Sequence, residues 1–229
     1  MHKIQNNILG FLLFKQKARF SEINKNNISN DHFTFHLKKL LDKKLIEKNK
    51  GGFYALTSIG KEYANRLDVD SGEIKIERQA KIGVLIICLD SSSKEKKYLI
   101  QQRLKQPYYG FYGFISGKMK WGEKVYESAE RELGEEAGLK AKLELVGIEH
   151  KMDYSQEGDL LEDKYFYIIK AVNFTGKLTE NFEGGKNICL TKKEIKKLPN
   201  LFDDVLKVIK VVDNNKFVFL EDKYIISQY

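Results

Sequence analysis

The chain has 229 residues, of which 42% are hydrophobic, and a formal net charge of +8. This length allows one or two domains with a substantial hydrophobic core, and two domains fit it better. Cys88 and Cys189 are far apart, which excludes a disulfide framework or a clustered thiol metal site and indicates a reducing cytoplasm. The apolar run Ile8 to Phe14 is too short to span a bilayer and lacks a small-residue cleavage site, so we expect neither a signal peptide nor membrane association.

The positive charge belongs to the N-terminal third of the chain. Residues 1–68 contain 13 Lys+Arg against 6 Asp+Glu, a net charge of +7, whereas residues 69–229 contain 27 against 26, a net charge of +1. The segment 68–73 is acidic and turn-prone, as expected of a linker. We therefore expect one domain at residues 1–68 and a second at residues 69–229.

The first domain is expected to contain helices and a glycine-tipped hairpin. In chain order, the predicted elements are helices at 4–14, 21–25 and 30–43, strands at 45–48 and 53–56, and a helix at 57–67. The two strands are separated by Asn49-Lys50-Gly51-Gly52, a strong turn sequence. This order of elements resembles a winged helix-turn-helix, and the stretch between Phe35 and Gly60 is similar to regulators of that kind.

The resemblance implies double-stranded DNA as a partner. The helix at 30–43 would enter the major groove and the hairpin would approach phosphates or the minor groove. The candidate contacts are Lys25, Asn30, His32, Thr34 and Lys38 on or before that helix, and Lys48 and Lys50 on the hairpin. Lysines at such positions add affinity rather than sequence selectivity. Alternatively, the domain binds protein or dimerises and its lysines keep it soluble. His36 is on the apolar face of the helix and is expected to be packed there.

The second domain alternates strand and helix candidates. The predicted elements are strands at 73–77, 82–89, 98–103, 143–149 and 164–171, and helices at 123–137, 195–198 and 202–212. This order allows an α+β domain in which helices flank a mixed sheet.

The predicted helix at 123–137 has one buried stripe. It contains no proline, and the apolar residues Val125, Ala129 and Leu133 recur at every fourth position. Gly138 stands where such a helix would end.

Three carboxylates crowd one face of this helix. Glu132, Glu135 and Glu136 have the spacing that places helical side chains next to one another. Such crowding is unfavourable without a neutralising cation, and a hard divalent ion with oxygen ligands, magnesium above all, is the usual companion of phosphates. A solvated acidic helix with Lys and Arg partners is the alternative. Gly117 and Gly122 precede the helix and allow the backbone to approach a ligand closely, which favours a magnesium and diphosphate site.

The same residues belong to a longer pattern between Gly117 and Leu139. Written with U for an apolar residue, it is G-x5-E-x7-R-E-U-x-E-E-x-G-U. The chain resembles the Nudix hydrolases at every position of this pattern, and the resemblance covers about residues 75–212. It implies an α/β/α sandwich with a mixed sheet. It also implies hydrolysis of a nucleoside diphosphate linked to another group, by water attack on phosphorus assisted by Mg²⁺ or Mn²⁺.

The resemblance assigns roles to individual residues. The implied catalytic residues are Glu132, Arg131 and Glu183; the implied metal ligands are Glu132, Glu135, Glu136, Glu123 and Ser116; the implied substrate-binding residues are Gly117, Lys118 and Arg103. Glu132 would also orient or deprotonate the water, and Arg131 would hold Glu132 in place. Glu123 would complete the metal shell or buttress the loop. Glu183 is preferred to Glu180 as the additional acid that this family often places outside the motif.

One position departs from the family pattern. Many members have Pro-Gly-Gly before the helix, whereas this chain has Ile115-Ser116-Gly117. A metal ligand supplied by the backbone carbonyl of Ser116 survives this change if the backbone angles suit a side chain. Activity is therefore expected.

The substrate cannot be chosen from the sequence. Five aromatic residues near the motif could stack a base, although packing explains most of them as well: Tyr108, Tyr109, Phe111, Tyr112 and Trp121. No pattern separates a nucleoside triphosphate, ADP-ribose, a sugar nucleotide and a diadenosine polyphosphate.

Two functions stay open. The chain is a magnesium-dependent hydrolase whose basic domain adds localisation, regulation or dimerisation, or it is a transcriptional regulator whose Nudix domain senses a nucleotide metabolite. The complete set of helix carboxylates and Arg131 favours the enzyme. A homodimer is expected by analogy.

Overall fold

The computed structural model describes residues 1–24, 28–68, 74–92, 94–214, 216–226 and 229. The chain divides into two compact units, Met1–Arg78 and Gln79–Tyr229, here called unit 1 and unit 2. Leu67–Asp68 pairs with Lys75–Ile76, so the residues that follow the predicted linker still belong to unit 1.

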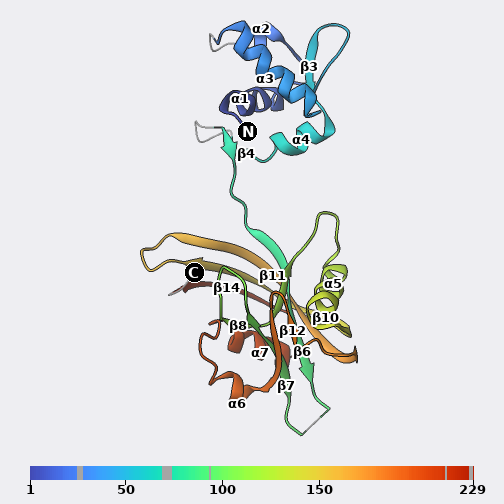
Figure 1. The fold of residues 1–229 in the computed structure, drawn as a ribbon, viewed down its shortest axis with the longest axis vertical. Coiled ribbons are helices and arrows are strands. Elements are labelled where there is room, and N and C mark those ends of the chain that lie inside the picture. The colour runs from blue at the N-terminus through green and yellow to red at the C-terminus, as the bar shows by residue number, and fades with distance from the viewer. Residues whose placement is uncertain (25–27, 69–73, 93, 215, 227–228) are drawn as a thin grey trace. The chain divides into compact units, whose positions relative to one another are not determined.

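Unit 1 has the predicted order of three helices, a hairpin and a further helix (Figure 1). Its elements are α1 (Lys3–Leu13), β1 (Ala18–Arg19), α2 (Phe20–Ile23), α3 (Asn30–Asp42), β2 (Ile46–Lys48), β3 (Phe53–Leu56), α4 (Ser58–Ala64), β4 (Leu67–Asp68) and β5 (Lys75–Ile76). The antiparallel sheet has the order β1-β3-β2, and β1 is a strand that the sequence did not reveal. Leu9 of α1 and Leu40 of α3 are fully buried in a shared core.

Local interactions explain where the elements of unit 1 begin. The Thr57 hydroxyl accepts a hydrogen bond from the Gly60 backbone N–H at 3.0 Å, which caps α4. A Cβ on Gly60 would lie 1.8 Å from the Leu45 carbonyl oxygen, so only glycine permits this close approach of α4 to the chain before β2. In the hairpin turn, the Asn49 side chain accepts hydrogen bonds from the backbone N–H groups of Gly51 and Phe53.

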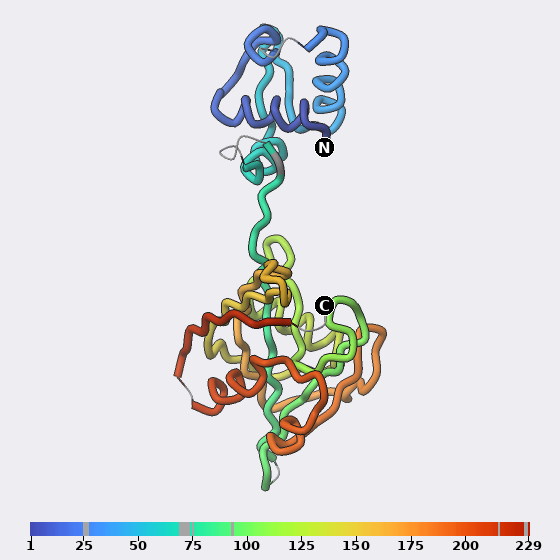
Figure 2. The backbone as a smooth tube through the Cα atoms, turned by 90° about the vertical axis from the view of Figure 1, so that its left-hand side faces the viewer, coloured from blue at the N-terminus to red at the C-terminus, as the bar shows by residue number. Residues whose placement is uncertain are grey.

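Unit 2 contains a large mixed sheet with helices on both faces (Figures 1 and 2). Its elements are β6 (Lys81–Asp90), β7 (Lys97–Arg103), β8 (Tyr112–Gly113), β9 (Ile115–Lys118), α5 (Val125–Ala137), β10 (Leu139–Tyr154), β11 (Leu160–Gly176), β12 (Asn181–Phe182), β13 (Gly185–Thr191), α6 (Lys192–Ile195), α7 (Val205–Asn214) and β14 (Val218–Ile225). The sheet order is β12-β13-β7-β6-β11-β10-β14, and β8 and β9 pair with β7 and β6. Strand β6 is parallel to β11, and β14 is parallel to β10, while the other pairs are antiparallel.

Alternation along the central strand β6 divides the core of unit 2 into two layers. Val84 and Ile86 belong to the cluster that packs against α5, whereas Leu85 and Ile87 belong to the cluster that packs against α7. Successive side chains of a strand point to opposite faces, so a continuous apolar run buries both faces of the sheet. This is the α/β/α sandwich that the sequence predicted.

Several elements of unit 2 differ from the prediction. The strands expected at 143–149 and 164–171 extend to Leu139–Tyr154 and Leu160–Gly176, which form a long antiparallel pair. The short strands of the loop regions and the C-terminal strand β14 were not predicted. After α7 the chain returns as β14, the red segment near the C-terminus in Figure 2, which pairs with β10. Within the described residues, no helix is long and apolar enough to span a bilayer.

Candidate active site

A cavity of about 610 Å³ in unit 2 is lined by residues of the sheet strands, of the loops after β7 and before α5, and of the motif helix α5. It is lined by charged side chains from several elements: Lys81, Arg103, Lys105, Lys118, Lys120, Arg131, Glu132, Glu136, Lys151, Glu162, Lys164 and Asp204. Ser116, Gly117, Phe166 and Phe202 also contribute to the wall. A larger hollow of about 870 Å³ is lined by residues of other segments, including Asp90 and Lys142, and by none of the motif residues.

Arg131 joins the loop before α5 to the helix itself. Its guanidinium Nε and Nη2 donate to the two carboxylate oxygens of Glu123 at 2.7 and 2.9 Å, and its Nη2 donates to the Lys118 carbonyl at 3.1 Å. Its Nη1 donates to Glu132 at 2.5 Å and to Glu135 at 3.2 Å. Charge-assisted bonds of this kind fix the geometry of a carboxylate as well as its charge. Hydrogen bonds from Arg131 and from the Lys120 backbone N–H lower the pKa of Glu123 to about 2.

Gly117 lies against the carboxylate of Glu132. A Cβ at position 117 would stand 1.8 Å from Cδ and 2.0 Å from Oε1 of Glu132. Any other residue would therefore displace this carboxylate, because such distances are far inside van der Waals contact. Glycine at the end of β9 lets the strand and the helix carboxylate meet.

Glu136 lies about one helical turn after Glu132 on α5 and also lines the cavity. Its side chain accepts a hydrogen bond from Gln101 Nε2 at 3.0 Å and lies 3.8 Å from the Lys105 Nζ. Burial raises the pKa of this carboxyl group, although Gln101 and Lys105 partly offset the effect. Asn187 donates to the Glu136 backbone carbonyl at 2.7 Å and ties the end of α5 to β13.

The donors at this wall suit a hard divalent cation. Glu132 and Glu136 are each only 8% exposed, and carboxylate oxygens are the ligands that Mg²⁺ prefers. A nearby cation would oppose the effect of burial on the pKa of Glu136, because an opposite charge favours the ionised carboxylate. The Glu135 side chain, in contrast, is 58% exposed and accepts a hydrogen bond from Arg131 at 3.2 Å. Within the described ranges, no three acidic, histidine or cysteine side chains are already placed as a complete set of ligands.

Comparison with known proteins identifies this arrangement. A family model for the NUDIX domain matches residues 79–207, which include every strand of the sheet except β14, the cavity wall and α5. The chain belongs to the NUDIX family. A mutator MutT protein from Bacillus halodurans is 24% identical with a TM-score of 0.54, and the match covers 65% of this chain and 93% of that chain. The NUDIX domain of Shewanella oneidensis NrtR, solved with ADP ribose, is 15% identical with a TM-score of 0.52, and the match covers 69% of this chain and 97% of that chain. These structural likenesses show the fold.

The departure at Ser116 is compatible with the NUDIX fold. Ser116 belongs to the extended strand β9 and pairs with Leu85 of β6. It is not among the described non-glycine residues with positive φ, so its backbone accommodates a side chain. The backbone angles at Ser116 therefore suit a side chain, which is the condition for its carbonyl to keep the predicted role as a metal ligand.

The predicted substrate-binding residues line the NUDIX cavity, but one of them also has a structural task. Arg103 donates from Nε to the carbonyl oxygens of Lys105 and Pro107, at 3.0 and 2.5 Å, and shapes the loop that follows β7. Burial lowers the pKa of Arg103, and the carboxylate of Glu136 opposes that shift. Lys118 is exposed at the cavity edge.

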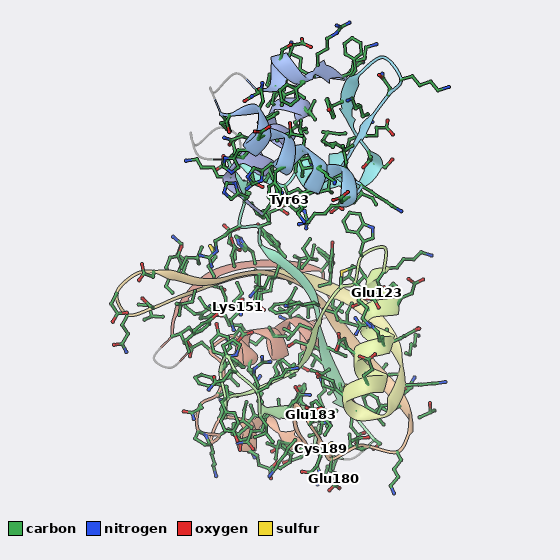
Figure 3. The ribbon with its side chains drawn as sticks, turned by 45° about the horizontal axis from the view of Figure 1, so that its top comes forward. Tyr63, Glu123, Lys151, Glu180, Glu183 and Cys189 are labelled. Atoms are coloured by element: carbon green, nitrogen blue, oxygen red, sulfur yellow. The ribbon has the colours of Figure 1, made fainter. Side chains whose placement is uncertain are left out.

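The structure does not bring Glu183 to the cavity wall. Glu183 is exposed in the turn between β12 and β13, and Glu180 is exposed just before β12. Figure 3 shows both in the region of β12, away from Glu123 beside the start of α5. Neither residue lines the cavity. The role of Glu183 as an additional acid stays a prediction.

The aromatic residues near the motif fall into two groups. Tyr108 and Phe111 are buried in a small cluster with Phe202, so packing explains them. Trp121, in the loop before α5, is 94% exposed, and Tyr109 is also exposed.

The wall of the cavity opposite the motif could not be predicted from the sequence. Lys151 of β10 forms a 2.7 Å ion pair with Asp204, and both side chains are almost completely buried. The Lys151 ammonium also lies 4.7 Å from the ring centre of Phe202 and 5.0 Å from that of Tyr224. Burial alone would lower the pKa of Lys151, but Asp204 and its other acidic neighbours outweigh burial and raise it.

A second buried pair lies next to the first. Lys164 Nζ donates to Asp153 at 2.7 Å, and the Tyr108 hydroxyl donates to the same carboxylate oxygen at 2.6 Å. Burial lowers the pKa of Lys164, and Asp153 offsets part of that shift. The ammonium groups of Lys164 and Lys151 are therefore each fixed by an aspartate, and both residues line this wall of the cavity.

Glu149 of β10 is a further acidic residue near these two pairs. It is fully buried, and its two carboxylate oxygens have no hydrogen-bond partner among the described residues. Burial and the neighbouring Asp204 raise the pKa of Glu149 to about 8. The signal in the sequence was the alternation Glu149, Lys151, Asp153, which places three charges on one face of a strand.

The predicted DNA contacts of unit 1 are exposed. On α3 these are Asn30, His32, Thr34 and Lys38, and on the hairpin they are Lys48 and Lys50. Lys25 lies outside the described residues. His36 is buried on the same helix, as the sequence predicted. Binding of DNA by these residues stays a prediction.

Proposed function

We propose that this NUDIX protein is a divalent-metal-dependent hydrolase that cleaves a diphosphate bond in a nucleoside diphosphate derivative. The observation that carries the proposal is the cavity of about 610 Å³, whose wall contains the buried carboxylates of Glu132 and Glu136. Its volume lies within the range of about 300–1,000 Å³ usual for small-molecule sites. The wall of this cavity contains both carboxylates that can bind a metal and cationic groups that can contact phosphates, and diphosphate hydrolysis needs both.

The part of the cavity wall formed by β9, the loop before α5 and α5 itself is here called the motif wall. Its residues would have different roles. When bound, Mg²⁺ or Mn²⁺ would neutralise charge on the phosphoryl oxygens and lower the pKa of the attacking water. Glu132 and Glu136 would hold the ion, with the backbone carbonyl of Ser116 as a further oxygen donor. Glu132 would also orient or deprotonate the water, and its 2.5 Å bond to Arg131 keeps it in position for this task. Arg103 and Lys105 would contact the substrate phosphates.

Turnover of a substrate panel tests the proposal. Nucleoside triphosphates, ADP-ribose, sugar nucleotides and diadenosine polyphosphates are incubated with the full chain and Mg²⁺, and release of phosphate and nucleoside monophosphate is measured. We expect turnover of at least one compound and its loss in Glu136→Gln. Glu130→Gln is the matched control, because Glu130 is an exposed glutamate on the same helix. Equal turnover in the wild type and Glu136→Gln would contradict the proposal.

A second candidate function is transcriptional regulation, in which the NUDIX domain senses a nucleotide metabolite. The observation in its favour is the basic unit 1, whose candidate contacts on α3 and on the hairpin are exposed. Tight binding of one compound from the panel without turnover would favour this function over the enzyme.

DNA binding by unit 1 is tested with a labelled random duplex and the full chain. We expect affinity to fall steeply with salt and the slope of log K against log salt to decrease by roughly 0.9 for each lost phosphate contact. Lys48→Gln and Lys50→Gln should each show this decrease. Lys61→Gln is the control, because Lys61 is an exposed lysine of α4 outside the predicted contact set. Salt-independent binding, or no binding, would contradict DNA recognition by this unit.

A further inference from the structure

Three of the four histidines of the chain gather in unit 1, far in sequence from the motif. His32 and His36 belong to α3, and His2 is the N-cap residue of α1. The His2 and His36 rings are stacked with centroids 4.3 Å apart, and the His2 and His32 centroids are 6.3 Å apart. Imidazole is the commonest metal ligand of proteins, so the geometry of its nitrogen atoms decides what such a cluster can bind.

The nitrogen atoms of His32 and His36 are spaced for chelation. The two residues are four positions apart, which places them on one face of the helix. Their Nε2 atoms are 3.2 Å apart. With Zn–N bonds of about 2.0–2.1 Å, this separation corresponds to an N–Zn–N angle of about 100°, close to tetrahedral. Two histidines with this spacing on a helix are a recurring zinc-binding arrangement.

His2 is placed to supply a third nitrogen. Its Nδ1 accepts a hydrogen bond from the Ile4 backbone N–H at 3.2 Å, which leaves Nε2 as the nitrogen for a metal. The stacked ring would have to turn towards the pair, because the described residues contain no three ligands already placed around a common point. Solvent can otherwise fill the remaining positions of a four-coordinate ion.

We propose that His32 and His36 chelate a borderline transition-metal ion, Zn²⁺ or Co²⁺, with His2 as a further ligand. The burial of His36 supports this, because a ring packed against the core keeps its Nε2 next to that of the exposed His32. The ion would connect the start of α1 to α3, two helices that already share a hydrophobic core. It would also engage His32, one of the predicted DNA contacts, so metal and DNA would influence each other's binding.

The alternative is a direct N–H···N hydrogen bond between the two imidazoles, which the same 3.2 Å separation allows. Metal titration separates the two explanations. The full chain carrying Glu132→Gln and Glu136→Gln is used, so that the NUDIX carboxylates do not contribute a second site. Co²⁺ binding is followed by visible d–d absorption, and Zn²⁺ binding by calorimetry.

We expect one equivalent of Co²⁺ to give a tetrahedral absorption spectrum that Zn²⁺ abolishes, and His32→Gln to weaken affinity at least tenfold. His32 is exposed, so this change should leave the fold intact. His2→Asn, which keeps an N-cap residue, should weaken binding to a smaller extent. The control is His150→Gln in unit 2, whose ring already contacts Asp163 and Glu221 at 2.9 Å. Absence of a stoichiometric site, or equal binding by the His32→Gln protein, would overturn the proposal.

Discussion

The two walls of the NUDIX cavity are both charged, but they are built in different ways. The motif wall comes from one short stretch, in which Glu123, Arg131, Glu132 and Glu136 are linked by Arg131 and by the helix. The opposite wall is assembled from β10, β11 and the residue before α7, which are distant in sequence. The residues proposed for catalysis can therefore be recognised within one short stretch of sequence. The residues of the opposite wall, which would contact the rest of a substrate, come together only through the pairing of distant strands.

The largest expected effect concerns the motif wall. Glu132→Gln keeps the size of the side chain and removes the charge that binds Arg131 and would bind the metal. We expect kcat to fall by about 10²–10⁴-fold, as for loss of a catalytic acid or base. The measurement is Mg²⁺-dependent turnover of the substrate identified in the panel, with Glu130→Gln as the control. Turnover within twofold of the wild type would remove Glu132 from the chemistry.

The opposite wall is tested through stability. Lys151→Met should destabilise the fold by about 3–5 kcal/mol, because it leaves Asp204 buried without its partner. Urea denaturation measures this change. The double variant Lys151→Met, Asp204→Leu should recover much of the loss, since an apolar pair can replace a buried ion pair. A single variant as stable as the wild type would show that the pair adds no stability.

A change at the contact between Gly117 of β9 and Glu132 of α5 tests activity separately from stability. Gly117→Ala would force the Glu132 carboxylate to move, and this flexible side chain can do so at little cost in stability. We expect kcat to fall on the order of 10²-fold, because a small displacement of a reacting group has a large effect.

The matched control is Gly134→Ala on the same helix. An added Cβ at Gly134 meets nothing within 4 Å and should stabilise the helix by about 0.5–1 kcal/mol. Thermal melts and turnover are measured for both proteins. Unchanged kcat in Gly117→Ala would show that the position of Glu132 is not critical.

A further expected effect concerns pH and the buried carboxyl group of Glu149. The pKa of Glu149 rises from 4.5 to about 8 on folding, so the folded state keeps its proton after the unfolded state has lost it. Stability from this group is present below about pH 4.5 and is lost as pH rises towards 8.

Glu149→Gln should therefore raise Tm at pH 8 by about 2–4 °C for each kcal/mol recovered, with less change at pH 5. Thermal melts of both proteins across this range measure the difference. A difference in Tm that does not depend on pH would show that Glu149 has the same pKa in both states.

The motif wall could be predicted because its information is local. Glycine positions, helix periodicity and the spacing of Glu132, Glu135 and Glu136 all follow from a single helix and the loop before it. The sequence could not show that Glu135 is largely exposed while Glu136 is buried, since exposure depends on what packs against the helix. It also could not place Glu183, because the turn between β12 and β13 is positioned by pairing with β7.

By itself, the sequence determined the α+β architecture, the helices and hairpin of unit 1, the motif helix and its family. These depend on the period of apolar residues and on fixed spacings within a few turns of chain. Only the tertiary structure decided that Lys151 and Asp204 pair in one wall of the cavity and that His2 stacks on His36. It also decided that the buried Glu149 carboxyl group has no hydrogen-bond partner among the described residues. Such contacts join residues distant in sequence, and their energy comes from burial and charge pairing that exist only once the sheet and helices are packed.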